Sequence, residues 1–143
     1  MLKIGELPAI ASILCGLLCL AGCKSESSVS VEGVVKLDNK PLADATVMFS
    51  PTRANAPGPF VGTTDREGRF ALRPVGTEQA GTAPGDYMVM ITTVKSDPND
   101  PDGLAPKQKE IVPGAFTDGS KRFNVPAGGT KDANFDIKTT LAR

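Results

Sequence analysis

The sequence of 143 residues contains no histidine, no tryptophan and a single tyrosine. Without histidine the chain lacks the commonest general base and metal ligand, which excludes Ser-His-Asp triads, histidine-ligated zinc and facial-triad iron. One tyrosine is also too little for the aromatic platform that sugar-binding modules usually present. Its 16 lysines and arginines balance 16 aspartates and glutamates, so we expect no basic field for nucleic acid.

The first 22 residues have a composition unlike the rest of the chain. Lys3 precedes an apolar run of about 12 residues, from Ala9 to Leu20. This run is shorter than the roughly 20 residues of a membrane-spanning helix, and it has the length and position of the hydrophobic region of a signal peptide. We therefore predict a signal peptide at residues 1–22. A buried core helix is the alternative, although the run shows no polar face at helical spacing.

Residues 20–23 read LAGC, directly follow the apolar run and match the bacterial lipobox at every position. The resemblance implies cleavage between Gly22 and Cys23 and lipidation of Cys23. Each buried CH₂ contributes about 0.8 kcal/mol, and two acyl chains hold a protein stably on a membrane. We therefore expect the protein to be attached to a membrane through the lipid on Cys23.

This assignment accounts for all three cysteines. Cys15 and Cys19 leave with the signal peptide and Cys23 carries lipid, so the exported domain has no thiol pair for a disulfide. Lys3 and Glu6 are the only charged residues removed, so the mature net charge stays at zero. Membrane attachment therefore depends on the lipid.

Residues 23–28 read as a lipidated cysteine followed by a flexible polar tether. In bacteria with two membranes, an aspartate after the lipidated cysteine usually signals retention at the inner membrane, whereas this chain has Lys24 there. By resemblance to that rule, we expect an exported protein anchored to the cell envelope. It would reside at the outer membrane, facing the periplasm or the cell surface.

Residues 29–143 show apolar residues at every second position between turns, which is typical of half-buried strands. With 15 glycines and 12 prolines, the chain is rich in turns rather than helices. The spacing predicts an all-β, seven-stranded antiparallel β-sandwich. The expected strands are residues 31–37, 45–50, 60–64, 69–73, 87–94, 121–125 and 132–138.

The sequence predicts the conformation of two turns and the position of one strand within its sheet. Residues 38–41 form a turn in which Asn39 can take a positive φ. Residues 65–68 form a hairpin turn, with 69–73 as the returning strand. Residues 87–94 are apolar or β-branched on both faces, so we expect this strand in the interior of a sheet.

Three long loops, residues 51–59, 75–85 and 95–110, are the expected contacts for any envelope partner, because loops on a rigid sandwich usually carry recognition. In the last of them, residues 97–103 read DPNDPDG and supply hard oxygen ligands. Pro101 stands where a calcium loop would place its third ligand, so a solvated acidic loop is favoured over a calcium site.

Three segments carry a family resemblance. They are VEGVVKLDNKPLADATV at residues 31–47, TTDREGRF at 63–70 and PGDY at 84–87. In this order they resemble the carboxypeptidase regulatory-like, transthyretin-like (prealbumin-like) β-sandwich domain of bacterial lipoproteins. Asn39 and Asp44 stand where that family often has glycine, and both residue types tolerate the left-handed region.

The resemblance implies a non-catalytic, lipid-anchored envelope protein with a binding, spacer or structural role. A hydroxyisourate hydrolase and intradiol dioxygenases share related architectures, but they use histidine, which this chain lacks. No G-x-S-x-G or S-x-x-K motif occurs either. We expect no enzyme, no cofactor and no catalytic or metal-binding residue. A calcium-dependent adhesion or carbohydrate-binding module, or a hydrolase, remains the alternative.

Overall fold

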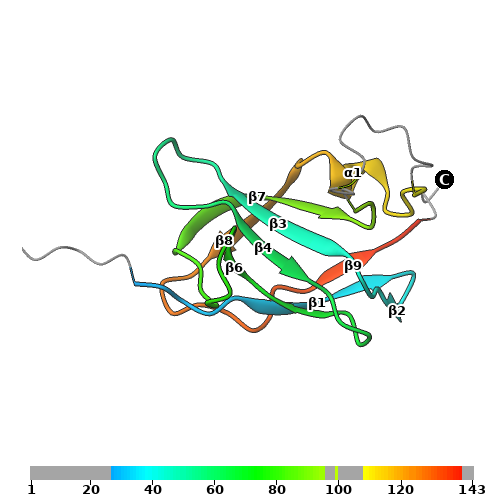
Figure 1. Ribbon diagram of the computed structural model, residues 1–143, viewed down its shortest axis with the longest axis horizontal. Helices are drawn as coiled ribbons and strands as arrows, with labels where there is room; N and C mark the ends of the chain where they lie inside the picture. Colours follow the sequence, from blue (N-terminus) through cyan, green and yellow to red (C-terminus); the bar gives the residue numbers. More distant parts are fainter. Residues whose placement is uncertain (1–26, 96–98, 100–107, 140–143) are drawn as a thin grey trace, which may run out of the picture.

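The computed structural model describes residues 27–95, 99 and 108–139 (Figure 1). In this part of the chain nine strands form two facing sheets, with one helix of four residues. The expectation of an all-β sandwich is therefore confirmed in its broad form. In chain order the elements are β1 (Glu32–Leu37), β2 (Lys40–Pro41), β3 (Thr46–Pro51), β4 (Phe60–Thr63), β5 (Arg69–Ala71), β6 (Arg73–Pro74), β7 (Gly85–Thr92), α1 (Gly114–Thr117), β8 (Lys121–Val125) and β9 (Phe135–Ile137).

The smaller sheet is built around β1. Its first half pairs antiparallel with β5 and its end pairs with β2, while β9 runs parallel to it. The predicted alternation holds, because Val31 and Val35 are buried and Lys36 is exposed. Gly33 lies where β1 meets the chain before β9, and a Cβ there would overlap the backbone carbonyl of Ala133. A side chain at this position would therefore push the two segments apart.

The larger sheet has the antiparallel order β6-β4-β3-β7-β8. β7 pairs with β3 from Tyr87 to Thr92 and with β8 from Gly85 to Val89. The interior position predicted for residues 87–94 is confirmed, although the strand begins at Gly85 and ends at Thr92. Lys121–Val125 forms β8 with the predicted bounds.

Aromatic side chains fill the space between the two sheets. Phe49 of β3 is fully buried, and its ring centroid lies 5.8 Å from that of Tyr87, 5.4 Å from Phe123 and 6.2 Å from Phe135. These partners come from β7, β8 and β9, so one side chain connects strands of both sheets. Each such pair adds about 0.5–1.5 kcal/mol beyond the burial of apolar area.

The predicted hairpin at residues 60–73 forms only in part. The turn itself forms, since the Gly68 N–H donates to the Asp65 carbonyl at 2.9 Å. However, most of the returning segment pairs elsewhere: β5 pairs with β1 in the smaller sheet, and only from Arg73, in β6, does the chain pair with β4 in the larger one. The chain changes sheets at Leu72, which is buried and donates its N–H to the Val31 carbonyl.

Other features also differ from the predicted seven antiparallel strands. Two of the nine strands, β2 and β6, are only two residues long, so alternation could not reveal them. The last strand is shorter than residues 132–138 and is parallel to β1. Helix α1 was not expected, because four residues are too few for a helical pattern.

The turn between β1 and β2 forms as predicted, and Asp38 takes a positive φ in addition to Asn39. Asp38 and Asn39 have φ values of 51° and 68°, which suits a two-residue hairpin turn, and Asp44 has a φ of 57°. The Asp38 carboxylate accepts hydrogen bonds from the hydroxyl and the N–H of Thr139. These bonds lower the pKa of Asp38 below its ordinary value.

The predicted signal peptide, Cys23 and Lys24 lie outside the described residues. Among the residues that the structure does describe, no helix is long and apolar enough to cross a membrane.

Two buried threonines give a matched test of the core. The Thr82 hydroxyl has no hydrogen-bond partner among the residues that the structure describes, whereas the Thr64 hydroxyl accepts the Ala45 N–H at 2.9 Å. Thr82→Val should therefore raise the free energy of unfolding by about 1 kcal/mol, because an unsatisfied polar group is removed. Thr64→Val should lower it by about 1–2 kcal/mol, because a buried N–H loses its acceptor.

Urea denaturation of the two variants and the unchanged chain measures both effects. Equal losses of stability in the two variants would contradict this account of Thr82.

Candidate functional site

An open hollow of about 380 Å³ lies at one end of the sandwich. It lies where the loop after β3 meets the start of β7, and Ser27 and Ala127 complete its wall. Two of the three predicted contact loops, residues 51–59 and 75–85, thus come together here. Its lining residues are Ser27, Pro51, Arg53, Ala54, Asn55, Ala56, Pro57, Ala83, Pro84, Gly85, Asp86, Tyr87 and Ala127.

Several polar groups of this hollow are engaged in holding the fold. The Tyr87 hydroxyl donates to the Ala83 carbonyl at 2.6 Å, and the Asp86 carboxylate accepts from the Asn124 side chain at 2.7 Å. Thr52 ties the loop to β7 through the backbone carbonyl of Asp86. Arg53 makes no ion pair with any residue that the structure describes. The lining of the hollow can bind a small polar group. Among its described lining residues, no nucleophilic side chain is hydrogen-bonded to a basic one.

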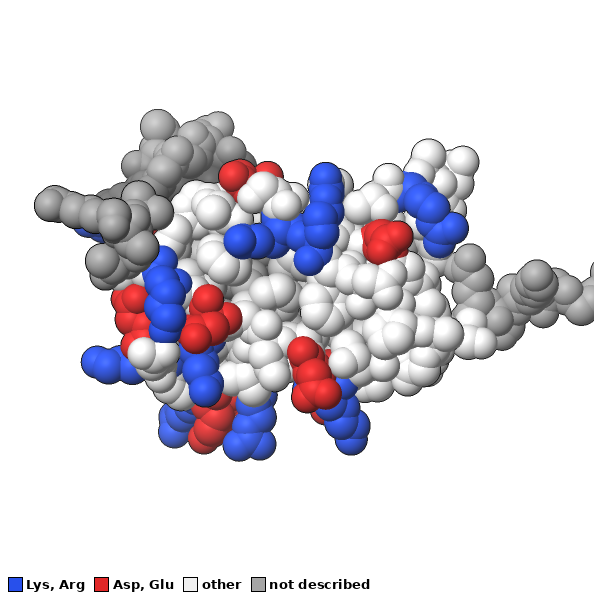
Figure 2. All heavy atoms as spheres, turned by 180° about the vertical axis from the view of Figure 1, so that it is seen from behind, with Lys and Arg blue, Asp and Glu red and all other residues white. Residues whose placement is uncertain are grey.

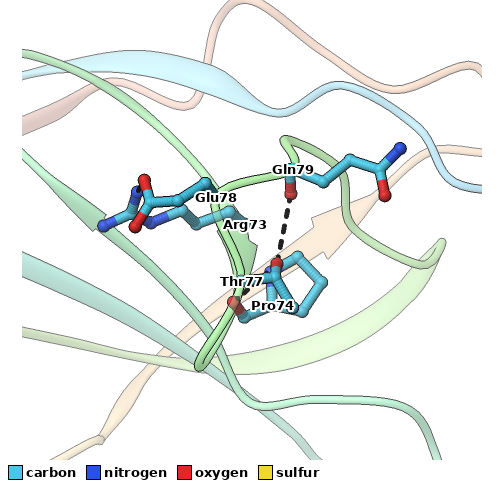
Figure 3. Close-up of polar contacts among 5 residues, drawn as sticks. All are labelled: Arg73, Pro74, Thr77, Glu78 and Gln79. Carbon is cyan, nitrogen blue, oxygen red and sulfur yellow. Dashed lines mark hydrogen bonds and ion pairs between the residues drawn. The ribbon is translucent and has the colours of Figure 1, made fainter.

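The loop that follows β6 is braced by local contacts. The Thr77 hydroxyl donates to the Pro74 carbonyl at 3.2 Å and to the Gln79 carbonyl at 3.5 Å, and Arg73 pairs with Glu78 (Figure 3). Val75, at 55% exposure, is one of the most exposed large apolar side chains described. An exposed ion pair adds little stability. The hydrogen bonds of Thr77 therefore contribute more than the Arg73–Glu78 pair to holding this loop in its conformation.

Of the third predicted loop, residues 95–110, the structure describes residues 95, 99 and 108–110. Its last residue, Glu110, is partly buried beside the end of β7. The carboxylate accepts hydrogen bonds from the hydroxyls of Thr92 and Thr93, and from the N–H groups of Thr93, Ile111 and Val112. Glu110 therefore lies at the opposite end of β7 from the open hollow. Glu110 fastens the returning chain to β7.

Burial of the Glu110 carboxyl would raise its pKa, but the hydrogen bonds outweigh burial. Thr92, Val112 and Thr93 stabilise the charged form, and together they lower the pKa from an ordinary 4.5 to about 2. Glu110 is therefore ionised wherever the domain is folded at moderate pH. Its contacts are those of a structural clamp.

Charges of both signs are mixed over the face shown in Figure 2, without a large area of one sign. Within the described ranges, no three Asp, Glu, Cys or His side chains come together where they could hold a metal ion. Asp97, Asp100 and Asp102 of the acidic loop lie outside those ranges. Asn99 is described and is exposed.

Sequence patterns missed two residues that matter here. Arg53 stands in a segment noted only as a proline-rich loop, and Glu110 stands at the end of a charged stretch. Arg53 belongs to no local motif, and the threonines that bind the Glu110 carboxylate lie on another segment. One signal was available for Glu110: two adjacent threonines at the end of a strong strand, which can bind a carboxylate.

Comparisons with known proteins add little to this picture. No family model matches the sequence, and no curated protein matches it. Among solved structures, the chain is similar to part of a 9R-lipoxygenase from Cyanothece PCC8801, with 16% identity and a TM-score of 0.36. The match covers 79% of this chain and 16% of the lipoxygenase, and a likeness this weak carries no argument about fold or activity.

The Glu110 clamp predicts an acid-sensitive domain. Since the folded pKa is lowered, its contribution to stability is complete above about pH 4.5 and is lost as the pH falls towards 2. Glu110→Gln should therefore lower the free energy of unfolding at pH 7 by about 1–2 kcal/mol and flatten its fall below pH 4.5.

Glu78→Gln is the matched control, because the Glu78 side chain is 91% exposed and makes a surface ion pair. Denaturant titrations between pH 2.5 and pH 7 test both variants. A Glu110→Gln variant with the same stability and pH profile as the Glu78→Gln variant would exclude the clamp.

Proposed function

We propose that this chain is a lipid-anchored protein of the bacterial cell envelope, with a non-catalytic binding, spacer or structural role. The observation that carries the proposal is the LAGC sequence at residues 20–23 directly after an apolar run of signal-peptide length. The first β pairing of the described domain is at Val29, six residues after Cys23. A short polar tether between lipid and domain is the arrangement that the proposal requires.

We further propose that the sandwich is a transthyretin-like, carboxypeptidase regulatory-like domain. Asn39 and Asp44 have positive φ, and they stand where the resemblance often has glycine. Phe70 and Tyr87 are both buried, as expected for core positions of such a domain. The seven strands of the expected sandwich would then correspond to the nine observed strands without the two-residue β2 and β6.

The tether restricts how the domain sits on the membrane. The four residues from Cys23 to Ser27 span at most about 14 Å, even when fully extended. Ser27 lines the open hollow, so that end of the sandwich, with Arg53 and the loop after β3, lies close to the bilayer in the anchored protein. The end that carries Glu110 and the β1–β2 turn then points away and is the more accessible to a partner.

The lipid assignment is tested at Cys23. Cys23→Ser should abolish labelling with an alkyne analogue of palmitate and release the protein from washed membranes, because two acyl chains provide the anchor. Cys19→Ser is the matched control and should label like the unchanged chain. Persistent labelling of the Cys23→Ser variant would overturn the proposal.

The orientation has a separate test in the anchored protein. Single cysteines replace Asn55, beside the hollow, or Lys40, in the β1–β2 turn; both positions are exposed. A fluorophore on residue 55 should be quenched more strongly by lipids that carry a nitroxide headgroup than one on residue 40. Equal quenching, or the reverse order, would contradict the proposed orientation.

A further inference from the structure

The three methionines after Met1 all lie on one face of the larger sheet. Residues 45, 47 and 49 around β3 and residues 87, 89 and 91 of β7 are buried in the core. The alternating residues Met48, Met88 and Met90 therefore point to the opposite, outer face. Each of the three residues is partly exposed.

The strand register brings these methionines together. Met48 of β3 stands directly opposite Met90 of β7, and Met88 precedes Met90 by two residues on the same face. Directly opposed residues have Cβ atoms about 4.5–5.5 Å apart, and diagonal ones are about 7–8 Å apart, which long side chains bridge. Methionine is unbranched and flexible, so three thioether sulfurs can converge above this part of the sheet.

We propose that Met48, Met88 and Met90 form a binding site for a soft monovalent metal ion, Cu(I), with three thioether ligands. Thioethers are soft donors that select Cu(I) over harder ions. They carry no proton to lose, so the site works over a wide pH range. The chain has no histidine, and none of its cysteines lies in the described β domain, so these sulfurs are that domain's softest donors. Binding is coordination alone, without a change in oxidation state.

The neighbours of the methionines disfavour a divalent ion more than a monovalent one. Val61 of β4 is opposite Met48, and Arg122 of β8 is opposite Met88. The Arg122 guanidinium repels a divalent ion about twice as strongly as a monovalent one at equal distance, whereas the thioethers are neutral. The site should therefore discriminate against Zn²⁺ and Cu²⁺ by charge as well as by softness.

The test uses the full chain in detergent with Cys15, Cys19 and Cys23 changed to serine, which removes the competing thiols. Silver(I) replaces Cu(I) as a redox-stable probe, and the methionine methyl groups are followed by ¹³C NMR. One equivalent of Ag⁺ should shift the signals of Met48, Met88 and Met90 together, while the Met1 signal stays in place. Signals that do not move, or that move with Met1 in proportion to excess Ag⁺, would overturn the proposal.

Affinity for Cu(I) is then measured under ascorbate against a colorimetric Cu(I) chelator. Each single Met→Leu variant should bind Cu(I) at least about tenfold more weakly, and the triple variant should not compete with the chelator. Val61→Leu is the matched control, since it alters an apolar side chain on the same face without removing sulfur. Full affinity in the triple variant would refute the site.

Leucine keeps the apolar character of each position, and a thermal melt of every variant verifies that it is folded. Because the test chain carries no lipid, the outcome is independent of the proposed anchoring at Cys23. A negative result here leaves the lipoprotein proposal untouched, and failure of lipid labelling leaves this site untouched.

Discussion

Packing of Phe49 between the two sheets is the interaction on which the rest of this domain depends. The ring is completely buried and contacts aromatic rings from β7, β8 and β9, so both sheets are held by the same side chain. Burial of a phenylalanine contributes about 1.5–3 kcal/mol, and the aromatic pairs add to this. The described domain contains no cysteine, so apolar packing must hold the sheets together without a disulfide.

The crossing at Leu72 determines how the two ends of the sandwich are used. Because the chain leaves the smaller sheet after β5 and enters the larger one at β6, the loop at residues 75–85 returns to the end where β7 begins. There it meets the loop after β3 and forms the open hollow. At the other end of β7, the Glu110 carboxylate accepts hydrogen bonds from the N–H groups of Thr93 and Val112. Two distinct surfaces result from one long strand.

The two faces of β7 also have different chemistry. Tyr87, Val89 and Ile91 belong to the core, while Met88 and Met90 stand on the outer face beside Met48. A strand with apolar residues on both faces is usually buried on both. Here the outer residues are only partly buried, and they are methionines rather than branched side chains. Arg122 stands on the same outer face opposite Met88, so the methionines form a small, partly exposed patch there, which motivates the soft-metal proposal.

Much of the local structure was predictable from the sequence. Alternation located β1 and β3, a run of apolar and β-branched residues located β7, and the Asp38-Asn39 turn followed from residues that tolerate positive φ. These features depend on neighbours in the chain, whose preferences local patterns record. The LAGC sequence and the apolar run are also local, and the proposed function depends on them rather than on the fold.

Tertiary structure decided which strands pair and which side chains meet. Residues 69–74 alternate like one returning strand, but burial of Leu72 between the sheets divides them between two partners. The parallel pairing of β9 with β1 needs Gly33 beside Ala133, a contact between residues 100 positions apart in sequence. The Glu110 clamp and the methionine face arise in the same way, from the β3–β7 register and the return of a long loop. Local preference determined the elements, whereas contacts between distant segments determined their arrangement, because a residue's pattern does not record its partner.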